Sequence, residues 1–287
     1  SCFGLADPEM WLYPRVLKAS QMKNTHLWRV ETACWTACPS AEDKMIGGWL
    51  CRASGGETRR TNSANATLES CSIRDVVGLV AKFYDHRDQP LLFRTVSFMP
   101  EVEQELAAKG FQPEGETHTL QADLSKASAI DFSGIELYSN PSDEWIAGKL
   151  RLSPMSPLQE TAYRTMLARI SVPACFARIV EKGKGLSLAY GALVDGILVI
   201  ESVVTDPAHR GKGLAGKVVG SLMTWAAGKG ATLSCLQVEA ANAPALSLYK
   251  KLGYETELYR YRYWRALCRK SWVNCNINRR NINDGRR

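Results

Sequence analysis

The stretch from residue 196 to residue 227 constrains the fold more than any other part of this chain. It runs from the apolar segment GILVIESVV through the turn TDPAHRGKG into LAGKVVGSLMTWAA, whose apolar residues recur at helical spacing. A short apolar run that ends in a turn is typical of a buried strand, and a glycine turn before a periodic apolar segment is compatible with a helix start. Strand, glycine turn and helix in this order predict an α/β fold.

Local signals order the rest of the second half. Ser156, Pro157 and Gln159 form a helix-start pattern in which Ser and Gln side chains satisfy backbone amides of the first turn. Asp195-Gly196 is a hairpin signal between two strand-like runs. We expect a strand at IELYS, helices opened by NPSDEW and by Ser156, three strands, and then helix, strand, helix and strand. This order predicts a mixed sheet rather than an all-parallel one.

The first half shows a short similarity to the second. Residues 91–124 and 233–263 both read as strand, helix and strand, and they align with Gly110 over Gly253 and Phe111 over Tyr254. This match predicts that the chain contains two copies of one fold. The first half is further expected to contain helices near 24–38, 68–85 and 99–111 and strands near 47–56, 91–98 and 117–124.

Charge excludes one class of function. The chain has 36 Lys and Arg residues against 29 Asp and Glu residues, but residues 268–287 carry five of the seven net positive charges. The remaining body has no basic footprint of the kind that binds nucleic acid, so no specific nucleic-acid partner is expected. Residues 266–287 lack periodicity and are rich in Asn and Arg, which predicts a disordered basic tail.

Cysteine usage and hydropathy predict a cytoplasmic protein. Nine cysteines at irregular spacings, without a CxxC pair, indicate reduced thiols. They form no ligand pattern with the four histidines, so no metal is expected. No apolar run reaches the ~18 residues of a transmembrane helix, and the start lacks a signal-peptide pattern, so no membrane partner is expected.

The turn after the apolar strand has the properties of an anion site. Free amides at a helix start carry positive potential, glycines let the backbone approach an oxyanion closely, and basic side chains supply countercharge. A solvated glycine turn at a helix start explains the same pattern, and neither a dinucleotide fingerprint nor a P-loop matches. The candidate anion-binding residues are Arg210, Gly211, Lys212, Gly213, Leu214 and Ala215.

Several separated pieces in a fixed order resemble the GNAT superfamily of acyl-CoA N-acyltransferases. The matching pieces are Arg210-x-x-Gly213-x-Ala215, the strand LSCLQVE, Asn242, Ala245, Leu248-Tyr249 and Leu252-Gly253-Tyr254. The resemblance covers roughly residues 134–265. The first half looks like the degenerate amino-terminal copy of two-domain members, and no R-x-x-G-x-[GA] pattern occurs before residue 205.

The resemblance implies a tandem architecture. We expect two GNAT-like α/β domains, each a mixed, mostly antiparallel twisted sheet flanked by helices. Residues 1–133 would form the degenerate domain, which serves as a lid or substrate-cleft wall, or only as a stabilising second core. Residues 134–265 would form the catalytic domain that binds acetyl-CoA, followed by the tail.

The resemblance also assigns roles to residues. The pyrophosphate of acetyl-CoA would lie on the amides of Gly211–Ala215 beneath Arg210. The backbone groups of Val203 and Val204 would pair with the pantetheine arm and polarise the thioester carbonyl. Tyr249 matches the general acid near the sulfur, and Asn242 matches an asparagine that contacts the cofactor. A core aromatic and a helix N-cap, respectively, explain these last two residues equally simply.

A carboxylate inside the apolar strand is the candidate general base. Glu201 interrupts GILVIESVV, and carboxylates rarely lie in buried strand centres. Its place before Asp206-Pro207 puts it near the point where the sheet splays. A salt bridge or a solvated edge position is the competing interpretation. Glu239 on the neighbouring strand is the second candidate, water is a third, and Asp206 fits turn chemistry.

The predicted enzyme is therefore an acetyl-CoA-dependent N-acetyltransferase that acts by direct attack of an amine. No Cys or Ser has the neighbours of a covalent nucleophile. A small-molecule amine is the expected acceptor, because a two-domain cleft encloses its ligand. Amine-bearing antibiotics, aminoglycosides or cyclic peptides, are one such class, which would confer resistance. The alternatives are acetylation of a protein N-terminus or lysine, and a non-catalytic acetyl-CoA sensor. The protein is expected to be a monomer or homodimer.

Overall fold

A single sheet runs through both halves of the molecule. The computed structural model describes residues 25–70, 72–126 and 133–266, and eleven strands in these ranges form one sheet. In spatial order the strands are β1 (Glu42–Ile46), β2 (Trp49–Ala53), β3 (Ala64–Asn65), β4 (Leu92–Val96), β11 (Thr256–Arg265), β5 (Gln112–Asp123), β10 (Leu233–Glu239), β9 (Ile197–Thr205), β8 (Lys184–Val194), β7 (Ala174–Glu181) and β6 (Ile135–Tyr138). The predicted tail lies outside the described ranges from position 267 onward.

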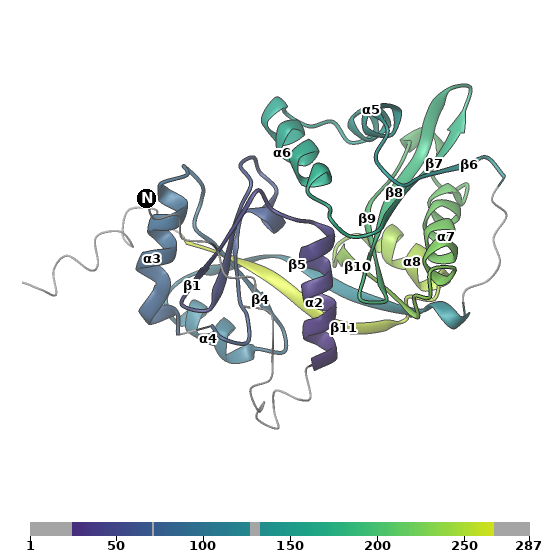
Figure 1. The fold of residues 1–287 in the computed structure, drawn as a ribbon. Coiled ribbons are helices and arrows are strands. Elements are labelled where there is room, and N and C mark those ends of the chain that lie inside the picture. The colour runs from purple at the N-terminus through teal and green to yellow at the C-terminus, as the bar shows by residue number, and fades with distance from the viewer. Residues whose placement is uncertain (1–24, 71, 127–132, 267–287) are drawn as a thin grey trace, which may run out of the picture.

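The two halves exchange strands at the centre of this sheet. The last strand, β11, pairs antiparallel with β4 and with β5, and β5 pairs antiparallel with β10. Figure 1 shows the yellow β11 lying among the strands of the first half. The expectation of a separate sheet for each half is therefore corrected. The physical reason is that the exchange leaves neither half with an unpaired strand edge at the junction.

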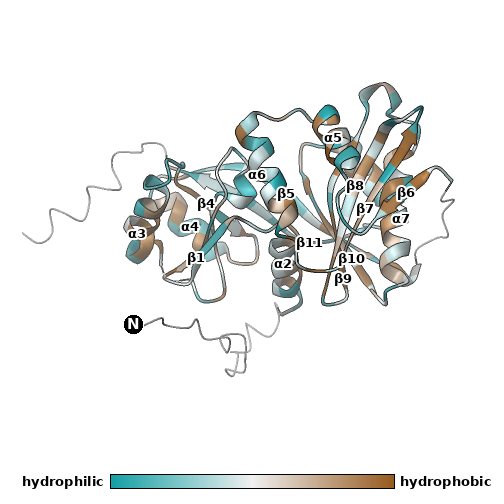
Figure 2. Cartoon of the chain, turned by 45° about the horizontal axis from the view of Figure 1, so that its top comes forward, coloured by the Kyte–Doolittle hydropathy of each residue, from teal (hydrophilic) through white to brown (hydrophobic). Residues whose placement is uncertain are grey.

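Helices cover both faces of the sheet. Alternate residues of β9 face opposite sides of the sheet. Leu198 and Ile200 belong to one hydrophobic core cluster, and Ile197 and Val199 belong to another on the opposite face. The first face carries α3 (Ile73–Asp85), α4 (Pro100–Ala108), α7 (Leu214–Ala227) and α8 (Ala243–Lys251), and the second carries α2 (Thr25–Ala37), α5 (Asp143–Leu152) and α6 (Pro157–Ala168). Figure 2 shows hydrophobic residues along β6 and β7 beside α7. None of the described helices is long and apolar enough to cross a membrane.

The local signals in the sequence have the predicted structures. α6 begins with a complete capping box between Ser156 and Gln159. The hairpin between β8 and β9 turns at Asp195 and Gly196, which both have positive φ, as a tight antiparallel turn requires. The sheet contains a parallel pair, β9 with β10, among antiparallel neighbours, so the prediction of a mixed α/β sheet is confirmed.

The two similar segments correspond element by element. α4 and α8 have the same length, and they occupy the same positions relative to the glycines that the sequence alignment superimposes. These glycines, Gly110 and Gly253, have φ of 82° and 90°, and the next residues, Phe111 and Tyr254, are both buried. Parallel pairs lie in equivalent places, β3 with β4 and β9 with β10. Outward from the central β11–β5 pair, β4, β3, β2 and β1 correspond in order to β10, β9, β8 and β7, and β6 has no counterpart among the described residues.

Candidate active site

The sheet splits beside Glu201. The parallel ladder between β9 and β10 ends at Ile200 opposite Leu236, although both strands continue. β10 stays paired with β5 as far as Glu239 opposite Thr117, while β9 stays paired with β8. The splay that the sequence predicted near Glu201 is thus present. Glu201 is the first residue of β9 beyond the ladder.

A β-bulge follows the split. The register between β8 and β9 shifts so that Ser202 and Val203 together oppose one residue of β8. Ser202 has a φ of +58°, which is uncommon for a residue other than glycine. Its hydroxyl oxygen lies 2.9 Å from the hydroxyl oxygen of Tyr163 on α6, a contact that fixes the bulge. Val203 packs toward α7, and Val204 packs toward the cluster beneath α5 and α6.

The start of α7 is open to an anion. Gly213 is the N-cap residue with a φ of 76°, and no side chain of the described residues caps this turn. Gly211 has a similar φ of 77°, and a Cβ at either glycine would meet nothing within 4 Å. Arg210 and Lys212 are exposed beside them. The six predicted residues from Arg210 to Ala215 therefore lie together in one turn whose shape and charge fit a pyrophosphate.

Asp206 has the structural role that the sequence favoured. Its carboxylate accepts a hydrogen bond of 3.0 Å from the amide of Ala208 and caps the 3-10 turn η3 (Pro207–His209). Asn242 likewise caps α8, because its side-chain oxygen accepts a hydrogen bond of 3.2 Å from the amide of Ala245. This cap uses only the oxygen of the Asn242 side chain.

Tyr249 is buried close to Glu201. The residue is 7% exposed, and its ring lies edge-on to Tyr254 with centroids 5.9 Å apart. Burial raises the pKa of Tyr249 to about 12, and the negative charge of Glu201 adds to the increase. The phenol therefore keeps its proton at neutral pH, as a general acid must.

An arginine from the first half contacts Glu201. Nη1 of Arg60, in the 3-10 turn η1 (Arg59–Thr61), lies 2.5 Å from Oε1 of Glu201, which is 9% exposed. Burial is the largest influence on Arg60 and lowers its pKa, but the Glu201 carboxylate, together with Tyr261, Cys38 and Tyr263, raises the pKa above its usual value. The candidate base is thus paired with a permanent cation.

The second candidate base is paired in the same way. Nη2 of Arg59 lies 3.3 Å from Oε1 of Glu239, and its Nη1 lies 3.4 Å from Oε1 of Glu114. The side chain of Glu239 is 65% exposed, so its pairing is weaker than that of Glu201. Two consecutive arginines of the first half therefore reach the two candidate bases of the second half.

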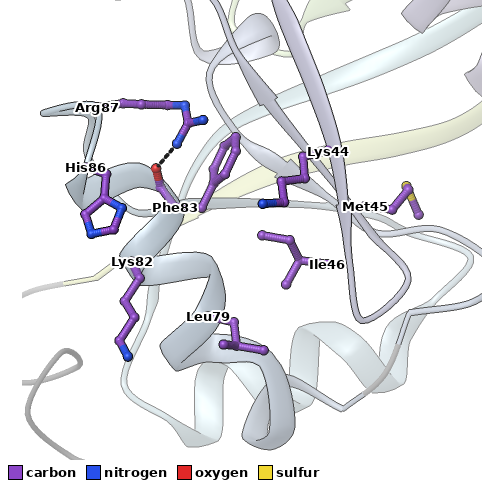
Figure 3. Close-up of a pocket in the computed structure, with 8 residues that line it drawn as sticks. All are labelled: Lys44, Met45, Ile46, Leu79, Lys82, Phe83, His86 and Arg87. Atoms are coloured by element: carbon purple, nitrogen blue, oxygen red, sulfur yellow. Dashed lines mark hydrogen bonds between the residues drawn. The ribbon is translucent and has the colours of Figure 1, made fainter. Parts of the chain in front are cut away.

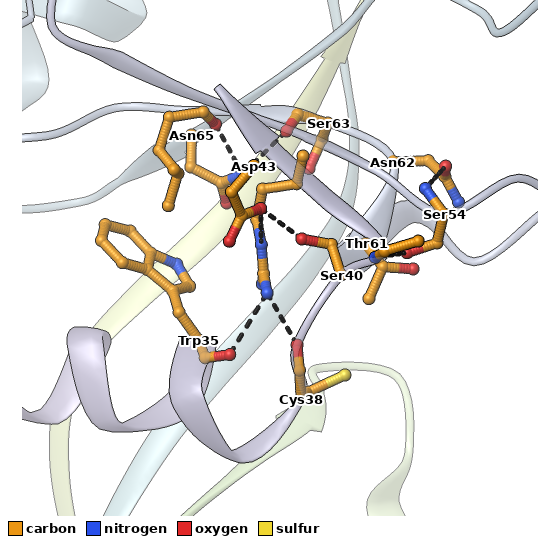
Figure 4. Close-up of polar contacts among 12 residues, drawn as sticks. Trp35, Cys38, Ser40, Asp43, Ser54, Thr61, Asn62, Ser63 and Asn65 are labelled. Atoms are coloured by element: carbon orange, nitrogen blue, oxygen red, sulfur yellow. Dashed lines mark hydrogen bonds and ion pairs between the residues drawn. The ribbon is translucent and has the colours of Figure 1, made fainter. Parts of the chain in front are cut away.

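Polar contacts around η1 hold these arginines in place. The Asn62 side chain accepts from the Ser54 amide at 2.8 Å and donates to the carbonyls of Gly55 and Thr58. The buried Arg52 of β2 donates to the carbonyl oxygen of Cys38 at 2.8 Å and so ties β2 to the end of α2. Figure 4 labels Cys38, Ser54 and Asn62 among these contacts. The loop that presents Arg60 is therefore built as a fixed part of the fold.

Three more polar residues lie around the split, and sequence reasoning missed them. Lys149 on α5 is 8% exposed, and its Nζ lies 5.9 Å from the ring centroid of Tyr163. Burial lowers the pKa of Lys149, and the charge of Glu201 opposes this shift. Gln237 on β10 and Thr119 opposite it on β5 have buried side-chain polar atoms without a hydrogen-bond partner among the described residues. The interruption of LSCLQVE by Gln237 was the available signal in the sequence.

Tyrosine and arginine alternate along β11, in the segment YRYRYW. Tyr259, Tyr261 and Tyr263 on β11 are buried on the face that α2 covers. The guanidinium of Arg59 lies 4.8 Å from the ring centroid of Tyr263. These three rings thus form a buried layer of side chains next to η1.

A cavity of about 510 Å³ lies elsewhere, between β1 and α3 of the first half. Figure 3 shows its lining, in which Arg87 donates to the carbonyl of Phe83. Its charged lining residues are basic, including Lys44 and Lys82, and none of the residues above takes part in it. In residues 25–70, 72–126 and 133–266 no group of His, Cys, Asp and Glu could hold a metal ion.

Solved structures of GNAT proteins share the fold of this chain, a mixed sheet flanked by helices. The GCN5-related N-acetyltransferase from Kribbella flavida matches with a TM-score of 0.60 and 16% identity over 88% of this chain and 97% of that one. A tandem GNAT protein from the clavulanic acid biosynthesis pathway matches with a TM-score of 0.55 and 14% identity over 67% of this chain and 69% of that one.

Residues 25–264 match the family model described as "Probable histone acetyltransferase Rv0428c C-terminal", and the chain belongs to this family. The uncharacterized N-acetyltransferase YobR of Bacillus subtilis is 27% identical over 79% of this chain and 92% of its own length. The resemblance found in the sequence is therefore confirmed at the level of the superfamily and the enzyme class.

Proposed function

We propose that this N-acetyltransferase takes the acetyl group from acetyl-CoA and transfers it directly to the amine of a small molecule. The observation that carries the proposal is the uncapped start of α7, whose glycine turn adjoins the splayed end of β9. Free amides, two glycines with open space and two exposed basic side chains suit the pyrophosphate of coenzyme A.

The same placement gives each predicted residue a task. The amides from Gly211 to Ala215 would bind the pyrophosphate beneath Arg210. The backbone of Val203 and Val204, at the bulge, would hold the pantetheine arm and polarise the thioester carbonyl. Asn242 would contact the cofactor with the part of its side chain that the helix cap does not use.

The reaction needs two proton movements. The nitrogen–carbon bond to the acetyl group forms as the carbon–sulfur bond breaks, the amine loses a proton, and the departing thiolate gains one. Tyr249, which is protonated at neutral pH, would donate the second proton. Glu201 is the candidate acceptor of the first, directly or through water, with Glu239 as the alternative.

We infer that the first half is a degenerate copy that forms the acceptor-side wall. Its support is the element-by-element match of α4 with α8 and the reach of Arg59 and Arg60 to Glu239 and Glu201. Such a wall would enclose the acceptor, which favours a small molecule. An amine-bearing antibiotic is one such acceptor.

A protein acceptor is the second candidate, because the family model is described as a probable histone acetyltransferase. Thiol release from acetyl-CoA across a panel of small amines, aminoglycosides, cyclic peptides and a histone-tail peptide separates the candidates. Release with small amines supports the first proposal, and release only with the peptide supports the second. Binding of acetyl-CoA without release would indicate a sensor.

A further inference from the structure

The charges around the split do not balance. Among the described residues around the split, Glu201 is the buried carboxylate. Two cations, Arg60 and Lys149, both interact with it. The amine of an acceptor enters near Glu201 and, when protonated, adds a third positive charge. A buried cation without a counterion is strongly unfavourable, so the site favours an acceptor that carries its own negative charge.

Two orphan polar groups lie on the same side of the split. Alternation along the strands places Gln237 on the sheet face of Glu201, since Val199 and Cys235 share one core cluster. Both amide atoms of Gln237 are buried and unpartnered within the described ranges, and so is the fully buried hydroxyl of Thr119 on the adjacent strand. Buried polar groups are normally hydrogen-bonded, and a polar acceptor can supply the missing partners.

The arrangement points to an acceptor that carries a carboxylate close to its reactive amine, an amino acid in the broad sense. This inference rests on the proposed acetyl transfer. The acceptor's ammonium would replace Arg60 as the partner of Glu201, and its carboxylate would take the released Arg60 as its own partner. The exchange leaves the net charge of the site unchanged and keeps Arg60 and Glu201 each paired, whereas an amine without a carboxylate would leave Arg60 alone. Gln237 would add hydrogen bonds to the carboxylate.

The test compares matched acceptors on the full chain. Thiol release from acetyl-CoA is measured with the twenty amino acids, the β-, γ- and ω-amino acids, and for each active one its carboxamide and its decarboxylated amine. We expect at least one amino acid to be preferred over its carboxamide by on the order of 100-fold in kcat/KM, because the carboxamide leaves Arg60 unpaired.

Variants then assign the preference to Arg60. The ratio of kcat/KM between the acid and its carboxamide should fall toward one in Arg60→Gln, remain partly in Arg60→Lys, and stay at the wild-type ratio in Arg59→Gln. If Arg60→Gln fails to fold, the wild-type acceptor comparison and Arg60→Lys still decide the question.

The outcomes separate this inference from the proposed function. If acetyl-CoA neither raises the melting temperature nor supports thiol release with any amine, acetyl transfer itself fails. If acetyl-CoA binds but carboxamides and plain amines react as well as the acids, or no amino acid reacts, only the carboxylate inference is overturned. An unchanged acid preference in Arg60→Gln would also overturn it.

Discussion

A carboxylate oxygen of Glu105 lies 2.9 Å from the backbone nitrogen of Ile73 and accepts its hydrogen bond at the first turn of α3. The same oxygen accepts a hydrogen bond from the hydroxyl of Ser72, the N-cap residue. α3 follows β3 as α7 follows β9, so the two helices occupy equivalent positions in the two halves. The Glu105 carboxylate occupies the start of α3, whereas the amides at the start of α7 have no side-chain cap among the described residues.

This contact predicts one acetyl-CoA per chain. A bound nucleotide would have to displace Glu105 from α3, whereas no side chain in the described part of the chain caps the first turn of α7. Isothermal titration calorimetry should give a stoichiometry of one, and two equivalent binding events would contradict the assignment.

The glycine turn should be essential for acetyl-CoA affinity. Gly213→Asp places a carboxylate at the start of α7, where repulsion of the pyrophosphate should weaken binding roughly 100-fold. Gly230→Asp is the matched control, because Gly230 has a φ of 85° and equally open surroundings beyond the end of α7. Each substitution should cost about 1 kcal/mol of stability through backbone strain. Equal affinities for the two variants would refute the assigned turn.

Removal of the Tyr249 hydroxyl should impair chemistry more than binding. Tyr249→Phe keeps the packing against Tyr254 but removes the proton donor, so kcat should fall roughly 100- to 10,000-fold while acetyl-CoA affinity stays close to that of the wild type. Steady-state kinetics and calorimetry give the two quantities. An unchanged kcat would leave Tyr249 as a core aromatic residue only.

The ion pair between the halves should be energetically coupled. Arg60→Met leaves the buried Glu201 without its closest partner and should cost about 3 kcal/mol of unfolding free energy. The double variant Arg60→Met/Glu201→Leu removes both charges and should recover most of this loss. Urea denaturation of the two single variants and the double variant measures the coupling, and additive losses would show that the pair contributes none.

Stability should decline at alkaline pH. Burial raises the pKa of Cys175 to about 11 and of Cys51 to about 12, and Tyr249 also titrates near 12. The unfolded chain loses these protons first, so it binds fewer protons than the folded chain and the unfolding free energy falls as pH rises from about 9 to 12. Urea midpoints at pH 8, 9.5 and 11 should decrease in that order, and less steeply in Cys51→Ala. A constant midpoint would contradict the pKa directions.

Local chemistry explains which features the sequence predicted. Ser156 and Gln159 define a helix start by themselves. The turn after β9 was predictable because its glycines and basic residues lie next to one another in the sequence. β1 was missed because its residues are mostly exposed and therefore show no alternation. Strand exchange was missed because the alternation YRYRYW looks the same whichever strand lies beside it.

The acceptor side of the site was hidden for a related reason. Arg60 lies in ETRRTNSAN, which by itself reads as a solvated basic loop, and its partner Glu201 lies far away in the sequence, in the other half of the chain. Lys149 lies on an ordinary amphipathic helix. Only the packing of the two halves gives these side chains a common environment.

The exchange of β5 and β11 also sets the order of events during synthesis. β11 is the last strand of the sheet to leave the ribosome, and it belongs between β4 and β5, which are both made before any strand of the second half. Until it arrives, β4 and β5 each expose an unpaired edge, so the nascent first half cannot reach its final structure alone. A message truncated before the codon for Thr256 would therefore damage both halves at once, and the cell's proteases would meet a chain with two open edges rather than one intact domain.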